Sequence, residues 1–188
     1  MTVKRKTRII IELIIGIIML ISIIYKVNLD KKTKTFIVEN YPIEIELKNS
    51  YTLVEEKNNY NFYATNNEKI YIGIFAYKVD DYDNFMLEDV LNNEIEYLGK
   101  TRDDVELLEE KKTMNTNDSI ITTAVYLGTK DNSARTIYML STISFNNAKN
   151  YNVMVIQTCK KINYNKYKNE MLKNLTNIRI INEVNKSL

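Results

Sequence analysis

The sequence predicts an α+β fold in which an N-terminal transmembrane helix precedes an antiparallel β-sheet covered by two amphipathic helices. Three observations support this prediction. Residues 9–25 form an almost unbroken apolar run, with Glu12 as its only charge. Most of the remaining chain consists of short alternating apolar segments separated by brief polar turns, as in β-hairpins. Residues 83–99 and 164–175 instead repeat their apolar side chains every three or four positions, which is typical of amphipathic helices.

The apolar run at residues 9–25 has the properties of an uncleaved signal anchor. At about 1.5 Å per helical residue it extends for roughly 26 Å, close to the thickness of a bilayer core of about 30 Å. No small-x-small cleavage site follows it, and a lipoprotein signal is excluded because the only cysteine is Cys159. Basic residues are denser before the run than after it, so we expect residues 1–8 to lie in the cytoplasm.

This interpretation divides the chain into four parts. They are a cytoplasmic tail (1–8), a transmembrane helix in the lipid bilayer (9–25), a polar stalk rich in lysine (26–35) and an extracytoplasmic α+β domain (36–188). The tail and the anchor hold four basic residues and one acid, so 22 of the 26 basic residues and 23 of the 24 acidic residues belong to the remainder. A domain so close to neutrality is not expected to bind nucleic acid.

Glu12 leaves an alternative interpretation of the N-terminal segment open. Residues 8–24 resemble the first segment of type IV pilins, in which a glutamate lies five residues after the processing point. Thr7 stands where pilins have glycine or alanine, and residues 27–32 do not continue an apolar stripe. A pseudopilin-like filament subunit is therefore the alternative to a signal anchor.

The folded domain is expected to contain several strands, one helix, a four-strand meander and a second helix. The run at residues 70–79 is nearly all apolar, so we expect it at the centre of the sheet with both faces covered. The first helix is predicted from its N-cap Asp83 to Gly99 at its C-terminus. The expected strands cover residues 36–39, 43–47, 51–56, 60–64, 70–79, 105–112, 120–127, 136–145, 151–158 and 177–181. The helix faces expected to be buried consist of Leu87, Leu91, Ile95 and Leu98, and of Tyr164, Tyr167, Met171 and Leu175.

The start of the domain resembles a known family. Residues 41–51, YPIEIELKNSY, are similar to the P-x-x-hydrophobic-P-x-x-W/Y pattern that opens PsbP/Mog1-like domains, with Lys48-Asn49 in place of the second proline. The order of elements over residues 36–181 also resembles theirs. The resemblance implies an antiparallel sheet between helices and an accessory or binding role, and it carries over no catalytic residues.

The composition excludes several kinds of catalytic site. The chain has no histidine, which removes Ser-His and Cys-His nucleophile pairs and the usual zinc sites. None of the four glycines lies in a phosphate-binding loop, and no serine lies in a G-x-S-x-G motif. Cys159 ends an apolar strand and is expected to be packed rather than reactive. We therefore expect no enzymatic activity and no cofactor, with a histidine-free hydrolase as the less favoured alternative.

One acidic group is a candidate for metal binding. Asp80, Asp81 and Asp83 follow the central strand, and clustered carboxylates are ligands for hard cations such as calcium. Their spacing is not that of an EF-hand, and Asp83 suits the N-terminus of the next helix. The pattern therefore favours a solvated loop over a metal site.

Tyrosines are abundant in the first half of the domain and suggest a binding surface. Tyr60, Tyr63, Tyr71 and Tyr77 alternate with smaller residues, and tyrosine is enriched both in protein interfaces and in ordinary strands. Taken together, the sequence predicts a single-pass cell-membrane protein with an extracytoplasmic accessory domain. Its expected partner is another envelope protein.

Overall fold

The computed structural model describes residues 12, 14–22, 32–55, 59–79, 87–130 and 133–181. Within these residues the chain forms strands, a helical segment at residues 14–22, two longer helices and a short 3-10 helix that precedes α3. The strands are β1 (Thr33–Ile37), β2 (Ile43–Lys48), β3 (Tyr51–Leu53), β4 (Phe62–Asn66), β5 (Ile70–Lys78), β6 (Asp103–Asn115), β7 (Ser119–Thr129), β8 (Thr136–Phe145), β9 (Tyr151–Lys160) and β10 (Ile178–Ile180). The helices are α2 (Leu87–Thr101), η2 (Lys161–Asn163) and α3 (Tyr164–Thr176).

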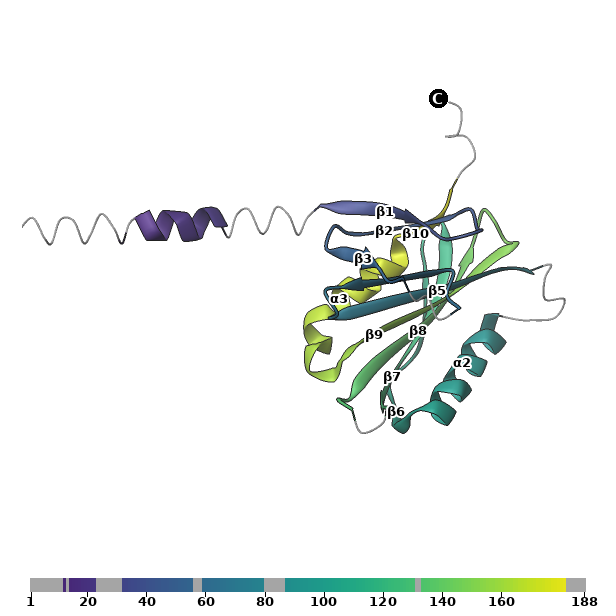
Figure 1. Cartoon of the computed structure of the whole chain (residues 1–188). Helices are drawn as coiled ribbons and strands as arrows, with labels where there is room; N and C mark the ends of the chain where they lie inside the picture. The colour runs from purple at the N-terminus through teal and green to yellow at the C-terminus, as the bar shows by residue number, and fades with distance from the viewer. Residues whose placement is uncertain are drawn as a thin grey trace, which may run out of the picture.

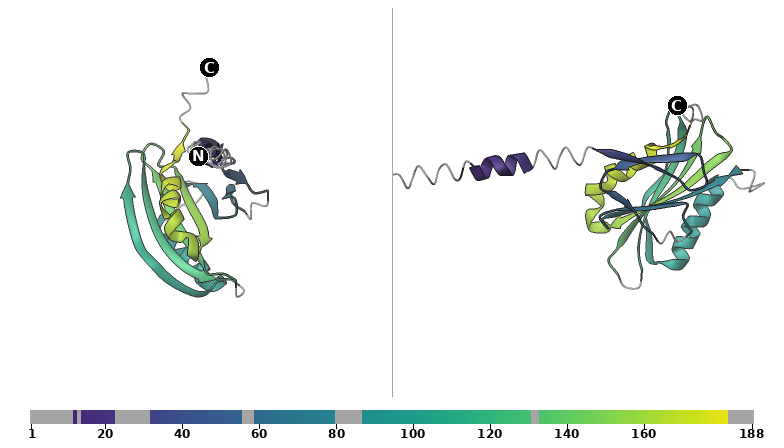
Figure 2. Two further views of the ribbon diagram at one scale, coloured as in Figure 1. Left: turned by 90° about the vertical axis from the view of Figure 1, so that its left-hand side faces the viewer. Right: turned by 45° about the horizontal axis from the view of Figure 1, so that its top comes forward.

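The strands form two antiparallel sheets rather than the single sheet predicted (Figure 1). The larger sheet has seven strands in the order β3-β4-β5-β9-β8-β7-β6, and the smaller has three in the order β1-β2-β10. β5 lies inside the larger sheet between β4 and β9, as its continuous apolar run predicts. The long strands of this sheet bend strongly along their length (Figure 2).

Other elements of the fold pack against both faces of the seven-stranded sheet. Alternate residues of a strand point to opposite faces of a sheet, so each strand contributes to both sides. On β8, Ile137 and Met139 belong to the apolar cluster shared with α3 and the small sheet, whereas Tyr138 and Leu140 belong to the cluster under α2. The small sheet and α3 therefore cover one face of the large sheet, and α2 covers the other.

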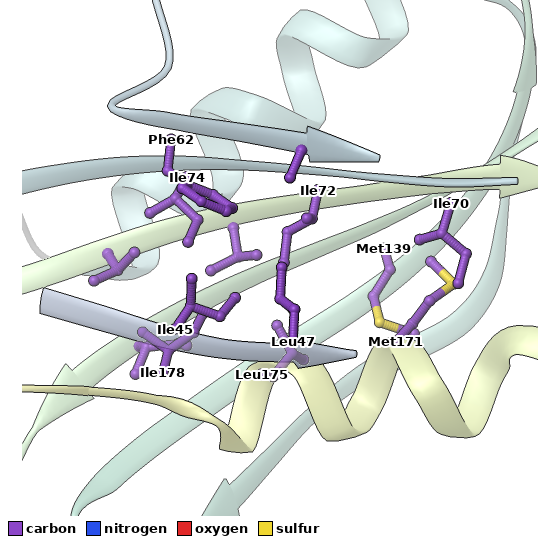
Figure 3. Packing of buried hydrophobic residues seen from close by; sticks show 14 of the residues in the cluster. Ile45, Leu47, Phe62, Ile70, Ile72, Ile74, Met139, Met171, Leu175 and Ile178 are labelled. Atoms are coloured by element: carbon purple, nitrogen blue, oxygen red, sulfur yellow. The ribbon is translucent and has the colours of Figure 1, made fainter. Parts of the chain in front are cut away.

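The main core lies between the small sheet, α3 and the large sheet (Figure 3). Ile43, Ile45 and Leu47 alternate along β2 and are buried, because the strict period of two directs all three to the same face. Figure 3 shows Leu47 of β2 close to Leu175 of α3. This packing places β2 and α3 against the same face of the large sheet.

Both amphipathic helices bury the faces that their periodicity predicts. Leu91 and Leu98 of α2 are buried and Ile95 is packed against the same cluster, while α3 buries Met171 and Leu175. The predicted end of the first helix was wrong, because α2 continues past Gly99 to Thr101. No described glycine has a positive φ, so Gly99 is an ordinary helical residue rather than a C-terminal cap.

The structure contradicts the transmembrane helix predicted over residues 9–25. Among the described residues, no helix is both long and apolar enough to cross a membrane. The predictions of a single-pass membrane protein, of bilayer contact and of an extracytoplasmic location rested on that helix, and they are corrected with it.

The fold class is corrected as well. Strands account for 51% of the described residues, so the domain is mostly β-sheet rather than the anchored α+β fold expected. Most of these strand residues belong to the seven-stranded sheet, and β1 and β10 pair with β2 in a sheet of their own. Strand-to-strand pairing, rather than helix packing, therefore dominates the fold.

Candidate functional site

A row of stacked aromatic rings lies on the face of the large sheet that α2 covers. Tyr60 precedes β4 and stacks on Tyr63 with ring centroids 5.1 Å apart, and it lies 4.3 Å from the ring of Phe75 on β5. Tyr71 extends the row, 6.0 Å from Tyr63. Tyr63, Tyr71 and Phe75 share a face because they alternate along paired strands. Three of the four tyrosines singled out in the sequence are therefore brought together.

Gly73 makes room for this row. A β-carbon built at Gly73 would lie 2.4 Å from the ring of Tyr60, which is closer than non-bonded atoms approach. Gly73 is paired with Tyr63 in the β4–β5 register, so the ring of Tyr60 lies directly above the backbone at this point. A glycine in a strand interior often marks such a close approach.

Beside this row, two adjoining pockets form a groove between α2 and the sheet, which we call the α2 groove. The first pocket has a volume of about 420 Å³ and the second of about 580 Å³. Phe75, Glu94 and Tyr97 line both pockets. The first pocket is also lined by Tyr77, Val90, Asn93 and Met154. The second is also lined by Asn59, Tyr60, Tyr63, Leu98, Thr101, Arg102, Thr136, Tyr138, Leu140, Ile156 and Thr158.

The described lining of the α2 groove contains two charged groups, and they differ in their partners. Arg102 donates from Nε to the hydroxyl of Tyr138 over 2.7 Å and from Nη1 to the carbonyl of Thr101 over 2.7 Å. Glu94 is half-buried, and loss of water raises the pKa of its carboxyl, although the nearby charge of Arg102 partly opposes that shift. The guanidinium is therefore held in place, whereas the carboxylate is desolvated.

Two tyrosines in the lining of the groove, Tyr60 and Tyr63, are uncharged at physiological pH. Burial raises the pKa of the Tyr60 phenol, and the nearby charge of Glu94 raises it further. The pKa of Tyr63 is also raised, first by burial and then by its neighbour Tyr71. Both hydroxyls therefore keep their protons, and the rings present neutral apolar surface.

The opposite face of the sheet holds a buried polar network centred on Glu170 of α3, whose side chain is only 10% exposed. The Tyr51 hydroxyl and the Asn66 amide donate to its Oε1 over 3.1 and 2.9 Å, and Lys48 forms an ion pair with Oε2. The amide of Asn174 donates to the Tyr51 hydroxyl over 2.9 Å. Because these polar groups satisfy one another's hydrogen-bonding capacity, the network holds α3 against the core and has a structural role.

A second ionic cluster ties α3 to the edge strand β6. Tyr164 donates to Oε1 of Glu109 over 2.7 Å, and Lys168 pairs with the same carboxylate. Partial burial alone would raise the pKa of Glu109, but the bonds from Lys168 and Tyr164 outweigh it and lower the pKa. Glu109 therefore has fixed partners on α3 rather than a freely solvated side chain.

The metal-site candidates Asp80, Asp81 and Asp83 lie outside the described residues. Within the described residues, no group of three or more carboxylates or cysteines is arranged to hold a metal ion. Cys159 is a buried free cysteine, as predicted, and burial raises the pKa of its thiol to about 11. A thiol with so high a pKa is a poor nucleophile at neutral pH.

Sequence reasoning missed the groups that give the α2 groove its charge. Glu94 lies three residues after Leu91 and one before Ile95, so it sits at the border of the buried stripe of α2. An acid at such a position could have been predicted to lie beside the sheet, because residues at the edge of the apolar stripe of an amphipathic helix lie close to the surface that the helix covers. Arg102 and Tyr138 carry no comparable signal, since only folding brings residues 36 positions apart into contact.

Comparison with solved structures identifies proteins of the same fold. CyanoP, the cyanobacterial PsbP of Synechocystis sp. PCC 6803, aligns with a TM-score of 0.59 at 8% identity, over 79% of this chain and 92% of its own. The Ran-binding protein Mog1p of Saccharomyces cerevisiae aligns with a TM-score of 0.54 at 12% identity, over 80% of this chain and 96% of its own. The fold is therefore PsbP/Mog1-like, as the resemblance predicted. No protein family and no curated protein sequence matches the chain.

Proposed function

We propose that this protein is an accessory binding domain that engages a protein partner through the α2 groove. The observation that supports the proposal is the concave aromatic surface formed by Tyr60, Phe75 and Tyr97 beside two charged groups. Binding sites are typically concave and mostly apolar, with a few convergent polar groups that fix orientation. Tyr97 lies at the groove with 59% of its surface exposed, and exposed tyrosines are enriched at protein interfaces.

The chemistry of the groove favours binding over catalysis. Among the described residues its charged groups are Glu94 and Arg102, and Arg102 is engaged by Tyr138 and Thr101. Hydrolases commonly use paired groups, such as two carboxylates or a nucleophile with its adjacent base. The described lining of the groove holds one carboxylate and no cysteine, so it lacks the paired groups of a hydrolase.

The fold also supports a protein partner. Mog1p is described as a Ran-binding protein, so one protein of this fold binds another protein. A shared fold does not transfer a partner, because functions are built from sites rather than folds. We therefore infer the partner from the groove itself: a protein segment that presents apolar side chains to Phe75, Tyr97 and Met154.

Site-specific photo-crosslinking in the full chain tests this proposal. A photo-reactive phenylalanine placed at Tyr97 in the organism that makes the protein should capture one partner of defined mass. The crosslinked peptide, sequenced by mass spectrometry, should contain apolar or aromatic residues. Substituting Phe75→Ala in the same chain should reduce the capture, because this substitution removes a wall shared by both pockets.

The matched control places the same photo-reactive residue at Ile162, which is 90% exposed in η2. Position 162 is not part of the groove lining, so it should not capture the same partner. Equal capture from both positions, or capture at Tyr97 that does not change with Phe75→Ala, would contradict binding through the α2 groove.

A further inference from the structure

The first pocket of the α2 groove combines aromatic walls with a single negative charge. Among the described residues that line it, Glu94 is the only charged one. Its neighbours in the lining include Phe75, Tyr97 and Met154, which provide apolar and polarisable surface. A carboxylate beside such walls costs free energy to desolvate, unless a partner compensates its charge.

Glu94 has no such partner within the part of the chain that the structure describes. No hydrogen bond or salt bridge of its carboxylate is found there, whereas Glu96 on the same helix pairs with Lys100. The nearby cation is Arg102, which lines the second pocket and directs Nε to Tyr138 and Nη1 to the Thr101 carbonyl. Arg102 therefore moderates the charge of Glu94 from a distance but does not occupy the first pocket.

These features match one class of ligand. An aromatic face attracts a cation through its quadrupole, and the attraction is strongest where water is excluded. Lysine and arginine side chains combine a cationic head with an aliphatic stem that packs on apolar surface. A pocket of about 420 Å³ with three aromatic walls and one acid offers surface for both parts of such a side chain.

We propose that the first pocket of the α2 groove binds a lysine or arginine side chain of the partner segment, with its cationic head at Glu94 and its stem against Phe75 and Met154. This inference rests on the proposed function and names the chemistry that the groove selects. Glu94 is thus a specificity-determining residue for the partner. The free-energy cost of desolvating the Glu94 carboxylate in the unbound protein is offset when the partner's cation binds beside it.

A titration of the full chain with two matched probes tests the inference. n-Hexylammonium imitates a lysine side chain, and 1-hexanol has the same alkyl stem without the charge. Binding is followed by NMR through the methyl resonance of Met154, which is buried at the base of the pocket lining. The wild-type protein should bind the ammonium about tenfold more tightly than the alcohol, as expected for a cation in a partly desolvated aromatic site.

Two variants identify the source of this preference. Glu94→Gln keeps the shape of the side chain and removes its charge, so it should lose most of the preference for the ammonium, with only the aromatic faces left to attract the cation. Glu96→Gln removes an exposed charge from the same helix and should keep the tenfold preference. Equal binding of the two probes by the wild-type protein, an unchanged preference in Glu94→Gln, or no response of Met154 to either probe would each overturn the inference.

The two proposals fail in different ways. If a partner is captured at Tyr97 but Glu94→Gln leaves that capture and the probe preference unchanged, the groove binds a protein without selecting a cation. If the probes show the preference but no partner is captured at Tyr97, the cation pocket exists and the proposed protein-binding function is wrong.

Discussion

The guanidinium of Arg102 donates a hydrogen bond from Nε to the hydroxyl of Tyr138 over 2.7 Å, with Cζ 5.4 Å from the centroid of the same ring. This contact joins the residue that follows α2 to the middle of the large sheet. It therefore fixes the position of the C-terminal end of α2, and with it one end of the α2 groove.

We predict that Tyr138→Phe destabilises the protein by about 1–3 kcal/mol, because the charged donor at Arg102 loses its acceptor in a partly buried site. Urea unfolding of the full chain measures the change. Tyr126→Phe on the neighbouring strand is the matched control, since no hydrogen bond of its hydroxyl is found within the described residues. Equal effects of the two substitutions would show that the Arg102–Tyr138 contact does not hold α2.

Truncation of Leu91 tests whether α2 contributes to the core. Leu91 is fully buried against Leu140 and Met154, so Leu91→Ala should cost about 2–5 kcal/mol. The same substitution at Leu53, which is largely exposed on β3, should change the free energy of unfolding by less than about 1 kcal/mol. A neutral Leu91→Ala would mean that α2 is not packed on the sheet as described.

A methyl group at Gly73 should disturb the aromatic row. Gly73→Ala places its β-carbon where the Tyr60 ring lies, so we expect a loss of about 1–3 kcal/mol from overpacking. The change should also shift the NMR resonances of Tyr60, Tyr63 and Phe75, which stack on one another. Unchanged resonances with unchanged stability would contradict the close contact.

The same substitution at Gly99 should have the opposite effect. Gly99 lies inside α2 with a negative φ, and nothing lies within 4 Å of a β-carbon built there. Gly99→Ala should therefore stabilise the protein by about 0.5–1 kcal/mol, because alanine loses less backbone entropy on folding into a helix. Thermal unfolding compared with that of Gly73→Ala measures both effects, and destabilisation by Gly99→Ala would contradict this assignment.

The desolvated carboxyl of Glu94 should make stability depend on pH in a particular direction. Its folded pKa is raised, first by loss of water, so the folded state binds a proton more tightly than the unfolded state. The stability that this group contributes therefore falls as pH rises from the ordinary glutamate pKa through the raised one. Glu94→Gln removes this dependence and should be increasingly stabilising, relative to wild type, as pH rises through that window.

Glu96→Gln is the matched control for the pH experiment. A hydrogen bond from Lys100 lowers the pKa of Glu96, which is the opposite direction. Because Glu96 is fully exposed, its substitution should have little effect, with any effect being a loss of stability above its ordinary pKa. Urea unfolding between pH 4 and about pH 8 compares the two variants, and parallel pH profiles for both would contradict the desolvation of Glu94.

Most of the local structure was predictable because periodicity along the chain determines it. The polar turns on either side of residues 136–145 predicted β8 with its observed bounds, and the apolar run in residues 70–79 predicted an interior strand. The helical spacing of Met171 and Leu175 predicted which face of α3 is buried. The predicted membrane-spanning helix was wrong, because no helix among the described residues is both long and apolar enough to cross a membrane.

The amino-acid sequence by itself determined which residues are apolar, where the period changes from strand to helix, and that the chain has no histidine chemistry. Only the tertiary structure decided that β10 pairs with β2 in a separate sheet, and that Glu94 lies beside Phe75 and Arg102 beside Tyr138. The physical reason is the separation along the sequence over which each kind of contact acts. Side-chain periodicity is set by neighbours a few residues apart, whereas the α2 groove depends on contacts between segments that only the packing of whole sheets and helices brings together.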